Sequence, residues 1–250
     1  MRYLNLIKNI ENWWLYLAVK FGLNRTEPLL FRARRGITME VPRRLLQTFK
    51  EIFMDECYMR GLARGVPSNP VIIDVGANAG YFTFYCASRF PEARIVAFEP
   101  MPANFRLLDA NRRLNPAESI TCVRMAVMGS PGMVGMSYDP GDSYTTSATV
   151  LKDSLGGGDV VQVPGVSLPE VFERWRLPHC DLMKMDCEGA EYDILYNTPR
   201  SCLAKIGRMA LEVHKGPEPG QNIDALSSYL MKQGFNTRQR PVGMLWAWRR

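Results

Sequence analysis

Residues 71–82, VIIDVGANAGYF, decide the fold of this chain. The β-branched residues that open the stretch predict a buried strand, and the aromatic-rich run at its end predicts a helix. Gly76 and Gly80 suit the tight turn between them, because glycine adopts backbone conformations that other residues disfavour. Asn78 lies within the turn, and the strand ends in a carboxylate, Asp74. Glycine turns at this place usually hold a phosphate, so the carboxylate needs an explanation.

Strands and helices alternate along the rest of the chain. The predicted strands are 71–76, 93–100, 119–127, 181–186, 208–214, 235–240 and 243–250, and the predicted helices are 81–90, 102–115, 167–175, one from about 191, and 223–233. Strands separated by helices predict a mostly parallel sheet that is covered on both faces. The apolar runs in these strands agree with burial on both sides.

Positive charge is concentrated at the N-terminus. The chain has a net charge of +6, but residues 1–50 alone hold ten Lys or Arg against three Glu. The other 200 residues hold 21 basic and 22 acidic side chains. A nucleic-acid partner is not expected, because the predicted sheet domain has no basic stripe. We place this domain at residues 51–250 and describe residues 1–50 as a basic, aromatic-rich, helical segment.

The N-terminal segment allows two interpretations. Its longest apolar run, Trp13–Val19, is far shorter than the ~20 residues that a membrane-spanning helix needs, and no small-residue cleavage site of a signal peptide is expected in it. As an amphipathic helix, residues 1–35 could contact a membrane surface with their basic side chains facing anionic lipid. They could instead pack on the domain or on a second subunit of a homodimer, which we favour because Trp-rich faces are more often buried.

The six cysteines contain no Cys-x-x-Cys pair and no zinc-ligand spacing. Most lie in apolar stretches, where cysteine behaves as a small hydrophobic residue. Because disulfides are rare in the cytoplasm, we expect reduced thiols and a cytoplasmic protein. It would be peripheral at the membrane if the N-terminal segment binds lipid.

The glycine turn disfavours a phosphate ligand. It reads G-x-N-x-G instead of the dinucleotide fingerprint G-x-G-x-x-G, and the Gly-Lys-Ser/Thr of a P-loop does not follow it. Asp74 would repel a pyrophosphate by about 1–4 kcal/mol at a few ångströms. A ligand with an ammonium group, a sulfonium and an unphosphorylated ribose fits better, because Asp74 could meet its cationic end and Glu99 could accept both ribose hydroxyls. That ligand is S-adenosylmethionine.

The residues expected to bind this cofactor follow the first three predicted strands. The carboxyl ends of parallel strands lie at one edge of a sheet, where ligands bind. The candidates are Asp74, Gly76, Asn78, Gly80, Tyr81, Phe82, Glu99, Pro100, Asn104 and Ala126.

The sequence resembles the FkbM-type methyltransferases. The matching pieces follow the order of that family over roughly residues 40–250: IDVGANAGYFT (73–83), AFEPMPANFRLLDANRRLN (97–115), MAV (125–127), DLMKMDCEGAEYDIL (181–195) and LEVH (211–214). The resemblance implies a Rossmann-like fold, with a mostly parallel seven-stranded sheet, helices on both faces and an antiparallel C-terminal strand. It also implies methyl transfer from S-adenosylmethionine to an oxygen, often a sugar hydroxyl.

Two parts of the chain depart from the pattern of that family. After the Ser-Leu pair before the fourth strand, the family often has an acidic residue, and this chain has Pro169 and then Glu170. Ser167 and Glu170 have the spacing of a helix capping box. Residues 129–165 match no family motif, and their Gly, Ser, Asp and Thr content predicts loops and a hairpin on the acceptor side. The sequence therefore does not decide whether the acceptor is a hydroxyl of a sugar or glycan, or a polyketide or other small natural product.

The chemistry needs a group that removes the proton of the acceptor hydroxyl. Asp186 ends a predicted strand, where it would face the methyl group. His214 ends the next strand, and the near-neutral pKa of an imidazole suits a base or base-assistant. Glu188 is the third catalytic candidate, although a carboxylate just before a helix also stabilises the helix. Lys184 lies within a buried strand and is expected to have a carboxylate partner.

A metal ion is an alternative to a base acting alone. Asp186, Glu188 and His214 could hold Mg²⁺, which would lower the pKa of the hydroxyl and orient the acceptor. We do not favour this alternative, because no tight carboxylate cluster in the sequence enforces a metal site.

Other classes of function explain the sequence less well. A non-catalytic partner subunit that only binds the cofactor has no need of charges at the strand ends. A nicotinamide-dependent oxidoreductase would need the third glycine and would not suit Asp74. A nucleic-acid or protein methyltransferase would carry Asn-Pro-Pro-Tyr or a basic groove, and the sequence predicts neither.

Overall fold

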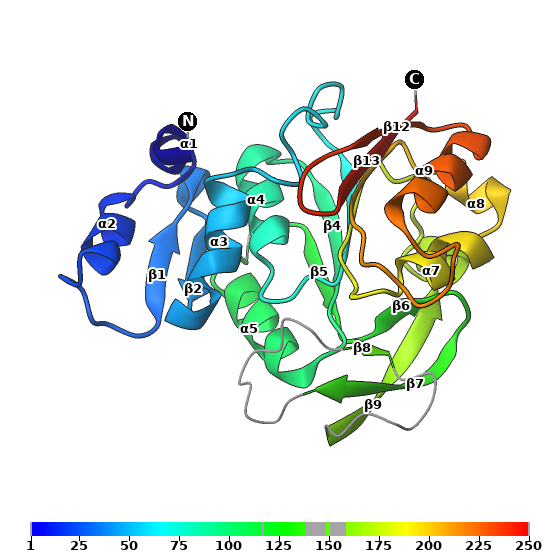
Figure 1. The fold of residues 1–250 in the computed structure, drawn as a ribbon. Helices are drawn as coiled ribbons and strands as arrows, with labels where there is room; N and C mark the ends of the chain where they lie inside the picture. The colour runs from blue at the N-terminus through cyan, green and yellow to red at the C-terminus, as the bar shows by residue number, and fades with distance from the viewer. Residues whose placement is uncertain (1, 117, 139–148, 151–158, 250) are drawn as a thin grey trace.

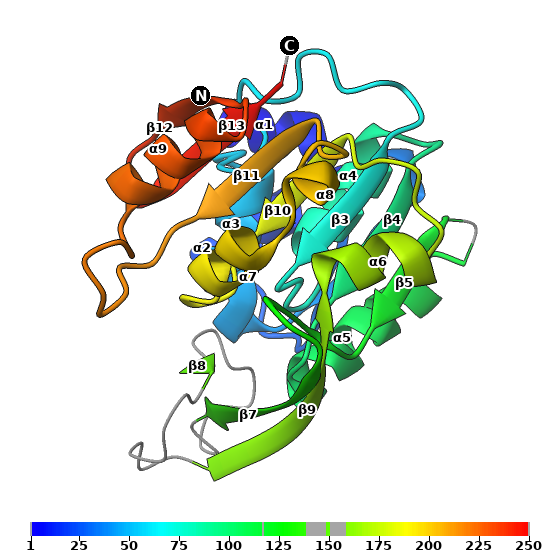
Figure 2. The same ribbon diagram turned by 90° about the vertical axis from the view of Figure 1, so that its right-hand side faces the viewer.

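A seven-stranded sheet forms the centre of the molecule (Figures 1 and 2). The structure is a computed structural model that describes residues 2–116, 118–138, 149–150 and 159–249. The strands lie in the order β12 (Asn236–Gln239), β13 (Met244–Trp248), β11 (Arg208–Glu212), β10 (Leu182–Met185), β3 (Val71–Val75), β4 (Arg94–Phe98) and β5 (Ile120–Val123). The pairs from β11 to β5 are parallel, and β13 is antiparallel to both of its neighbours. The expected fold class is confirmed.

Helices cover both faces of the sheet and divide the core in two. On one face lie α3 (Leu46–Phe53), α4 (Tyr81–Arg89) and α5 (Pro102–Arg113), and on the other α6 (Leu168–Arg174), α7 (Glu191–Asn197), the short α8 (Arg200–Leu203) and α9 (Ile223–Lys232). Successive residues of a strand point to opposite faces, so Ile72 belongs to the first core and Ile73 to the second. Helix α6 begins with the capping box expected at Ser167 and Glu170.

The strand predicted at 119–127 is divided between two sheets. β5 ends at Val123, and β6 (Ala126–Met128) belongs to a second sheet of order β6–β9–β7–β8. In this sheet β9 (Asp159–Ser167) is parallel to β6 and antiparallel to β7 (Gly132–Tyr138), and β8 (Thr149–Val150) pairs with β7. A small separate core of Met101, Ala126, Met136 and Val163 stabilises the second sheet. It buries apolar side chains that the central sheet leaves at its edge. Residues 139–148 and 151–158 of the expected loops lie outside the described residues.

Residues 2–53 combine helices with a β-hairpin, whereas the sequence predicted a helical segment. α1 (Arg2–Asn9) and α2 (Trp14–Lys20) precede β1 (Leu29–Arg32), which is antiparallel to β2 (Thr38–Val41). Short 3-10 helices, η1 (Arg34–Gly36) and η2 (Arg43–Leu45), lie before and after β2. Buried and less buried residues alternate along both strands. This period of two belongs to a strand with one face in the core, which is why the segment is not helical throughout.

The inner face of this N-terminal unit packs on the domain. Phe49 on α3 stacks on Phe31 with 4.3 Å between ring centroids, and it meets Tyr81 on α4 edge-on at 6.1 Å. The side-chain oxygen of Asn111 on α5 accepts a hydrogen bond from the backbone N–H of Glu40 at 2.7 Å. The boundary expected at residue 50 falls inside α3, and one hydrophobic core continues across it. The two parts therefore share a core.

Candidate active site

A cavity of about 210 Å³ lies at the carboxyl ends of β3, β4, β10 and β11. Strand-end residues were expected to meet here. Of the ten residues predicted to bind the cofactor, eight line this cavity: Gly76, Asn78, Tyr81, Phe82, Glu99, Pro100, Asn104 and Ala126. Asp186 and Glu188 also line it, and α3 contributes Thr48, Glu51 and Ile52. The N-terminal unit therefore supplies part of the cavity wall.

The glycine turn after β3 is in contact with the loop after β10. Gly76 has a φ of +71°, and a Cβ there would lie 1.9 Å from the carbonyl oxygen of Asp186. Only glycine allows this approach. Gly80, with a φ of +86°, ends the turn where α4 begins, but it does not line the cavity. Asn78 has a φ of +52°, a conformation that asparagine tolerates better than most residues.

Asp74 lies beneath the turn and does not line the cavity. Its side chain is fully buried, Oδ2 accepts a hydrogen bond from the Thr83 hydroxyl at 2.6 Å, and Oδ1 lies 3.6 Å from Lys184 Nζ. Burial raises the pKa of Asp74, and the charge of Lys184 opposes that rise. This corrects the expectation that Asp74 meets the cationic end of a ligand, because its carboxylate is occupied inside the protein.

Lys184 connects the ends of β3 and β10. Its ammonium donates a hydrogen bond to the carbonyl oxygen of Gly76 and lies 3.5 Å from Asp186 Oδ2. Burial acts to lower the pKa of Lys184, but the charges of Asp186 and Asp74 outweigh it and the pKa is raised. The carboxylate partner predicted for this lysine is confirmed, and there are two of them.

Glu99 follows β4 and is held by the backbone around it. Its Oε2 accepts the N–H of Asn78 in the glycine turn at 2.7 Å, and its Oε1 accepts the N–H of Met101 at 2.9 Å. Burial raises the pKa of Glu99 to about 7, although these hydrogen bonds act in the opposite direction. The side chain of Asn104 also donates a hydrogen bond to Glu99, so three of the four lone pairs of the carboxylate are used and one is left for a ligand in the cavity.

Tyr58 and Glu212 belong to the site and were not among the predicted residues. The Tyr58 hydroxyl lies 2.9 Å from Asp186 Oδ2 and 2.9 Å from Glu212 Oε2. All three residues line the cavity. A hydroxyl carries one proton, so both contacts are hydrogen bonds only when one carboxyl is protonated. Burial and the charge of Asp186 raise the pKa of Glu212, which favours the proton there.

The sequence holds a signal for Glu212 but none for Tyr58. Glu212 lies two residues before His214, and residues i and i+2 of a strand share a face, so the two could have been placed together. Tyr58 lies in the irregular segment between α3 and β3, where no motif marks it.

His214 lies between two glutamates. Its Nδ1 is 2.9 Å from Glu191 Oε1, and its Nε2 is 3.5 Å from Glu188 Oε2. The hydrogen bond to Glu191 and the charges of Glu191 and Glu188 raise the pKa of His214 to about 9, against the effect of burial. At neutral pH the imidazole is therefore protonated. This geometry favours the assistant role over the base role that the sequence left open for His214.

Glu188 lies in the loop between β10 and α7 with a strained backbone. Its φ of +53° is rare for a residue with a side chain, and such strain is found mainly at functional sites. Burial raises the pKa of Glu188 to about 7, while the nearby His214 lowers it. A carboxyl that faces the cavity with a pKa near 7 suits proton transfer.

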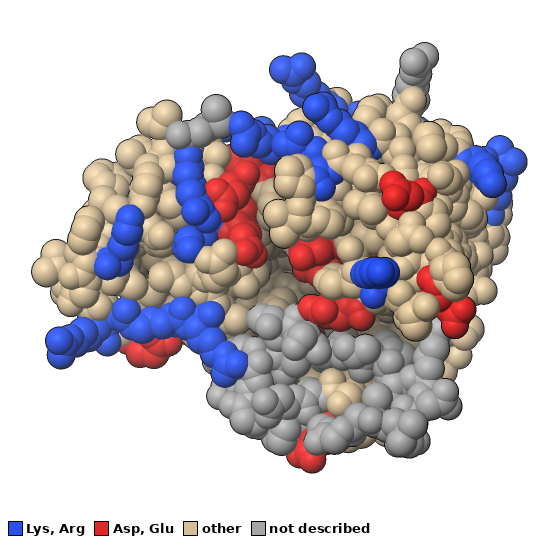
Figure 3. Space-filling view, in the orientation of Figure 1, with Lys and Arg blue, Asp and Glu red and all other residues tan. Residues whose placement is uncertain are grey.

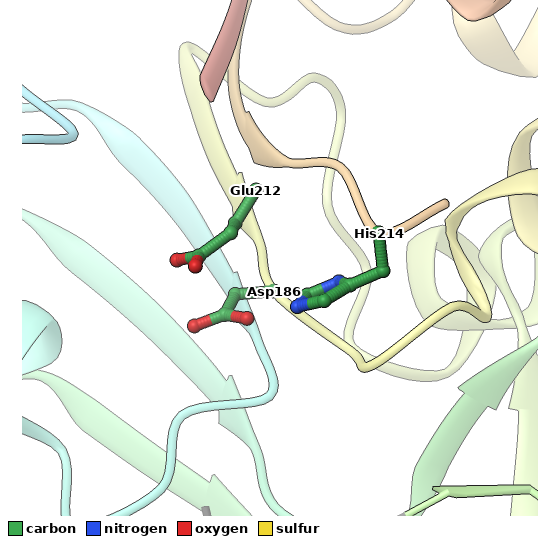
Figure 4. Close-up of side chains that lie close together, drawn as sticks. All are labelled: Asp186, Glu212 and His214. Carbon is green, nitrogen blue, oxygen red and sulfur yellow. The ribbon is translucent and has the colours of Figure 1, made fainter. Parts of the chain in front are cut away.

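Three side chains at the ends of β10 and β11 approach one another (Figure 4). Within the part of the chain that the structure describes, Asp186, Glu212 and His214 each offer one ligand atom, and these atoms lie within 4.8 Å of one another. This group contains Glu212 in place of Glu188, which the unfavoured metal alternative had named. However, Tyr58 already contacts Asp186 Oδ2 and Glu212 Oε2, and Lys184 lies beside Asp186. A cation would compete with both groups for these oxygens.

Asp and Glu side chains surround the central hollow of the molecule (Figure 3). The carboxylates that line the cavity itself are Glu51, Glu99, Asp186, Glu188 and Glu212, and Lys184 is the basic residue beside them. The cavity is therefore negative, and it favours a ligand that brings positive charge or hydrogen-bond donors.

The family model described as "Methyltransferase FkbM domain" matches residues 74–237. This range contains the glycine turn, Glu99, Asp186, Glu188, Glu212 and His214. It leaves out the whole N-terminal unit and also Tyr58, which follows that unit.

Three proteins of known name have sequences similar to this chain. The AMB antimetabolite synthetase AmbE of Pseudomonas aeruginosa is 31% identical over 234 residues, which cover 79% of this chain and 11% of that protein. The methyltransferase sdnD of Sordaria araneosa is 30% identical over 220 residues, or 77% of this chain and 83% of that protein. The hexuronic acid methyltransferase AglP of Haloferax volcanii is 23% identical over 230 residues, or 90% of each. The chain thus spans about a tenth of the length of AmbE but most of the length of the other two.

Proposed function

Because the chain belongs to the FkbM methyltransferase family, we propose that it transfers the methyl group of S-adenosylmethionine to a hydroxyl oxygen, and that the acceptor is a sugar or a glycan. The observation that carries this proposal is the position of Glu99, a buried carboxylate on the cavity wall that is fixed by two backbone N–H groups. The lone pair that its protein partners leave suits a hydroxyl of an unphosphorylated ribose.

The negative cavity supports a cationic cofactor. When bound, S-adenosylmethionine supplies an electrophilic methyl group on a positively charged sulfur. Asp186 and Glu188 reach the cavity, and in this proposal they provide the attraction for positive charge that Asp74 was expected to provide. Gly76 and Asn78 let the backbone of the turn approach a ligand closely.

Glu188 takes the proton of the acceptor hydroxyl in this proposal. It lines the cavity, and its pKa of about 7 matches a proton acceptor that works near neutral pH. His214 acts as a positioning residue, because its imidazolium lies 3.5 Å from Glu188 and is itself held by the buried Glu191. Asp186, held by Tyr58 and Lys184, orients the acceptor beside the methyl group.

A neutral sugar suits this acceptor side. Carboxylates accept hydrogen bonds, and a sugar offers several hydroxyl donors, whereas an anionic acceptor would be repelled by Glu51 and Asp186. The similarity to a hexuronic acid methyltransferase agrees with a sugar acceptor, although not with an anionic one.

A small natural product is the second candidate acceptor. Met101, Met125, Met128 and Met136 line the cavity, and methionine adapts to apolar ligands of varied shape. The similarity to an antimetabolite synthetase favours the same class.

The test uses S-adenosylmethionine with a labelled methyl group, incubated with the protein and an extract of its own host. Label in acid-hydrolysed sugar supports the first proposal, and label in the extractable small molecules supports the second. The Asp186→Asn variant is the control for transfer by other enzymes of the extract. If no fraction is labelled although cofactor binding is measured separately, the non-catalytic alternative gains support and methyl transfer is contradicted.

Methyl transfer without a resident metal ion stays a prediction. Loss of turnover in EDTA that Mg²⁺ restores would contradict it. A homodimer and a cytoplasmic location also stay predictions.

A further inference from the structure

The outer surface of the N-terminal unit carries exposed apolar side chains. Within the described residues, Phe21 and Leu23 expose 68% and 81% of their surface, and further large apolar side chains are exposed near them in sequence: Tyr3, Leu4, Ile7, Trp14 and Leu30. The opposite side of the same unit is buried, including Leu6, Ile10 and Phe31. The exposed set is therefore separate from the side chains that attach the unit to the domain. Apolar side chains that gather on a surface mark a site of interaction.

Contacts of Lys20 join the exposed side chains of α1 to those at the end of α2. Lys20 Nζ on α2 is 2.6 Å from the Tyr3 hydroxyl on α1, and it lies 5.1 Å from the centre of the Tyr3 ring and 5.9 Å from that of Phe21. Leu4 and Ile7 are three residues apart on α1, and Trp14 at the start of α2 lies seven residues before Phe21, the C-cap of that helix, so each pair shares a helix side. We call Tyr3, Leu4, Ile7, Trp14, Phe21 and Leu23 the N-terminal surface.

Basic residues accompany the N-terminal surface. Exposed Lys and Arg residues in this part of the chain are Arg2, Lys8, Lys20, Arg25, Arg32, Arg34 and Arg35, against the exposed acids Glu11 and Glu27. Figure 3 shows Lys and Arg side chains on the end of the molecule that carries α1, α2 and β1, whereas Asp and Glu lie mainly around the hollow. The surface thus combines apolar and aromatic side chains with a positive charge.

The positive charge and the apolar side chains of this surface favour one of the partners that could cover it. In a symmetric dimer the same patch would face itself, which would bring two basic surfaces together. A nucleic acid would attract the charge but would leave Leu4, Ile7 and Leu23 without an apolar partner, since its binding surfaces stack bases on aromatic rings. A bilayer with anionic lipids offers both a negative surface and an apolar interior for Trp, Phe and Leu side chains.

We propose that the N-terminal surface binds the face of an anionic lipid bilayer. α1 and α2 would lie along the interface, with Trp14, Phe21 and Leu23 in the headgroup region and the basic side chains at the lipid phosphates. None of the described helices is long and apolar enough to cross a membrane. The proposal concerns binding to the bilayer face alone, and it does not rest on methyl transfer.

The test measures cosedimentation of the full chain with vesicles. Vesicles of phosphatidylcholine with 30% phosphatidylglycerol are compared with pure phosphatidylcholine, each at 50 mM and 500 mM NaCl. We expect binding to the anionic vesicles at low salt, at least tenfold stronger than to neutral vesicles, and a marked loss of binding at high salt. A blue shift of tryptophan fluorescence should accompany binding.

Two variants separate the apolar and the electrostatic contributions. Trp14→Ser with Phe21→Ser removes apolar area, and Lys8→Glu with Arg25→Glu reverses two charges. We expect each pair to weaken binding to anionic vesicles about tenfold or more. The matched controls are Met231→Ser with Val242→Ser and Lys232→Glu with Arg238→Glu, which change exposed residues of the same kinds far from α1 and α2 in sequence. The controls should bind as the unchanged chain does.

Three outcomes would overturn the proposal. The first is no binding of the unchanged chain to anionic vesicles at low salt, a result that needs no variant. The second is equal loss of binding in the controls, which would mean general charge attraction. The third is a dimer of the unchanged chain that Trp14→Ser with Phe21→Ser returns to a monomer, measured by light scattering, since a second copy would then cover the surface.

Discussion

Carboxylates at the strand ends of this protein differ in what surrounds them. Asp74 and Glu191 are fully buried and hold Thr83 and His214 in place. Glu188 and Asp186 reach the cavity and keep side-chain oxygens for a ligand. At the scale of single residues, burial therefore separates groups that hold the structure from groups that can do chemistry.

Replacement of His214 should separate catalysis from cofactor binding. His214→Ala removes the cation that holds Glu188 at 3.5 Å, so we expect turnover to fall about 100-fold or more. The affinity for S-adenosylmethionine, measured by calorimetry, should stay nearly unchanged. His179→Ala is the matched control, since that histidine is exposed and contacts only Asp181 among the interactions described. Near-normal turnover of His214→Ala would remove His214 from the mechanism.

Cofactor affinity should depend on pH through Glu99. The pKa of Glu99 is raised to about 7, so its carboxylate can accept a ribose hydroxyl above pH 7 and is protonated below it. The Kd should therefore increase as the pH falls below 7, by at most about tenfold for each pH unit. Calorimetry between pH 5.5 and 8.5 measures this. In Glu99→Gln the affinity should be weaker at pH 8 and the slope should vanish, and an unchanged slope would assign the titration to another group.

At the scale of elements, the site depends on the contact between two loops. The turn after β3 and the loop after β10 come within van der Waals distance at Gly76 and Asp186, and Lys184 bridges them from within the sheet. Because β3 and β10 are parallel neighbours, both loops leave the sheet at the same edge. The close contact has two effects. It places Asn78 of the first loop beside Glu99, and it places Glu188 of the second loop at the cavity.

Gly76→Ala should disrupt this contact. Its Cβ would lie 1.9 Å from a backbone oxygen, so the loops must separate, and we expect both a lower free energy of unfolding and a large loss of cofactor affinity. Gly22→Ala is the matched control, because Gly22 has a φ of +73° and no atom within 4 Å of an added Cβ. The control should cost about 1–2 kcal/mol for the left-handed backbone alone. Similar losses in both variants, measured by urea unfolding, would contradict the steric explanation.

At the scale of the whole molecule, the N-terminal unit and the sheet domain share one core. Phe49 contacts Phe31 of β1 and Phe53 of α3, and it meets Tyr81 of the domain. α3 also supplies part of the cavity wall. The same unit thus connects its outer, basic surface to the site through a continuous packed layer.

Phe49→Ala should destabilise the whole chain. We expect a loss of about 3–5 kcal/mol in the free energy of unfolding, because removal of the ring leaves an empty space in the core where the two parts meet. Unfolding in urea, followed by circular dichroism and by tryptophan fluorescence, should give coincident transitions in both proteins. Leu114→Ala, at an exposed position after α5, is the control and should change stability little. A separate early transition of the N-terminal unit would contradict a shared core.

The sequence by itself determined the central sheet and most of the cavity wall. Alternating apolar runs and a glycine turn are local signals, and residues at the ends of parallel strands meet wherever the sheet forms. Gly76, Glu99, Asp186 and Glu188 could therefore be predicted without coordinates. The division of residues 119–127 between two sheets and the hairpin at β1 and β2 could not, because each depends on apolar partners distant in sequence.

Only the tertiary structure decided what each charged group does. Asp74 is enclosed by Thr83 and Lys184, and Tyr58 reaches Asp186 and Glu212 from more than a hundred residues away. The pKa of His214 is raised by two glutamates that the fold brings to it. Burial and the distances between charges set these roles, and both quantities exist only once the chain is packed.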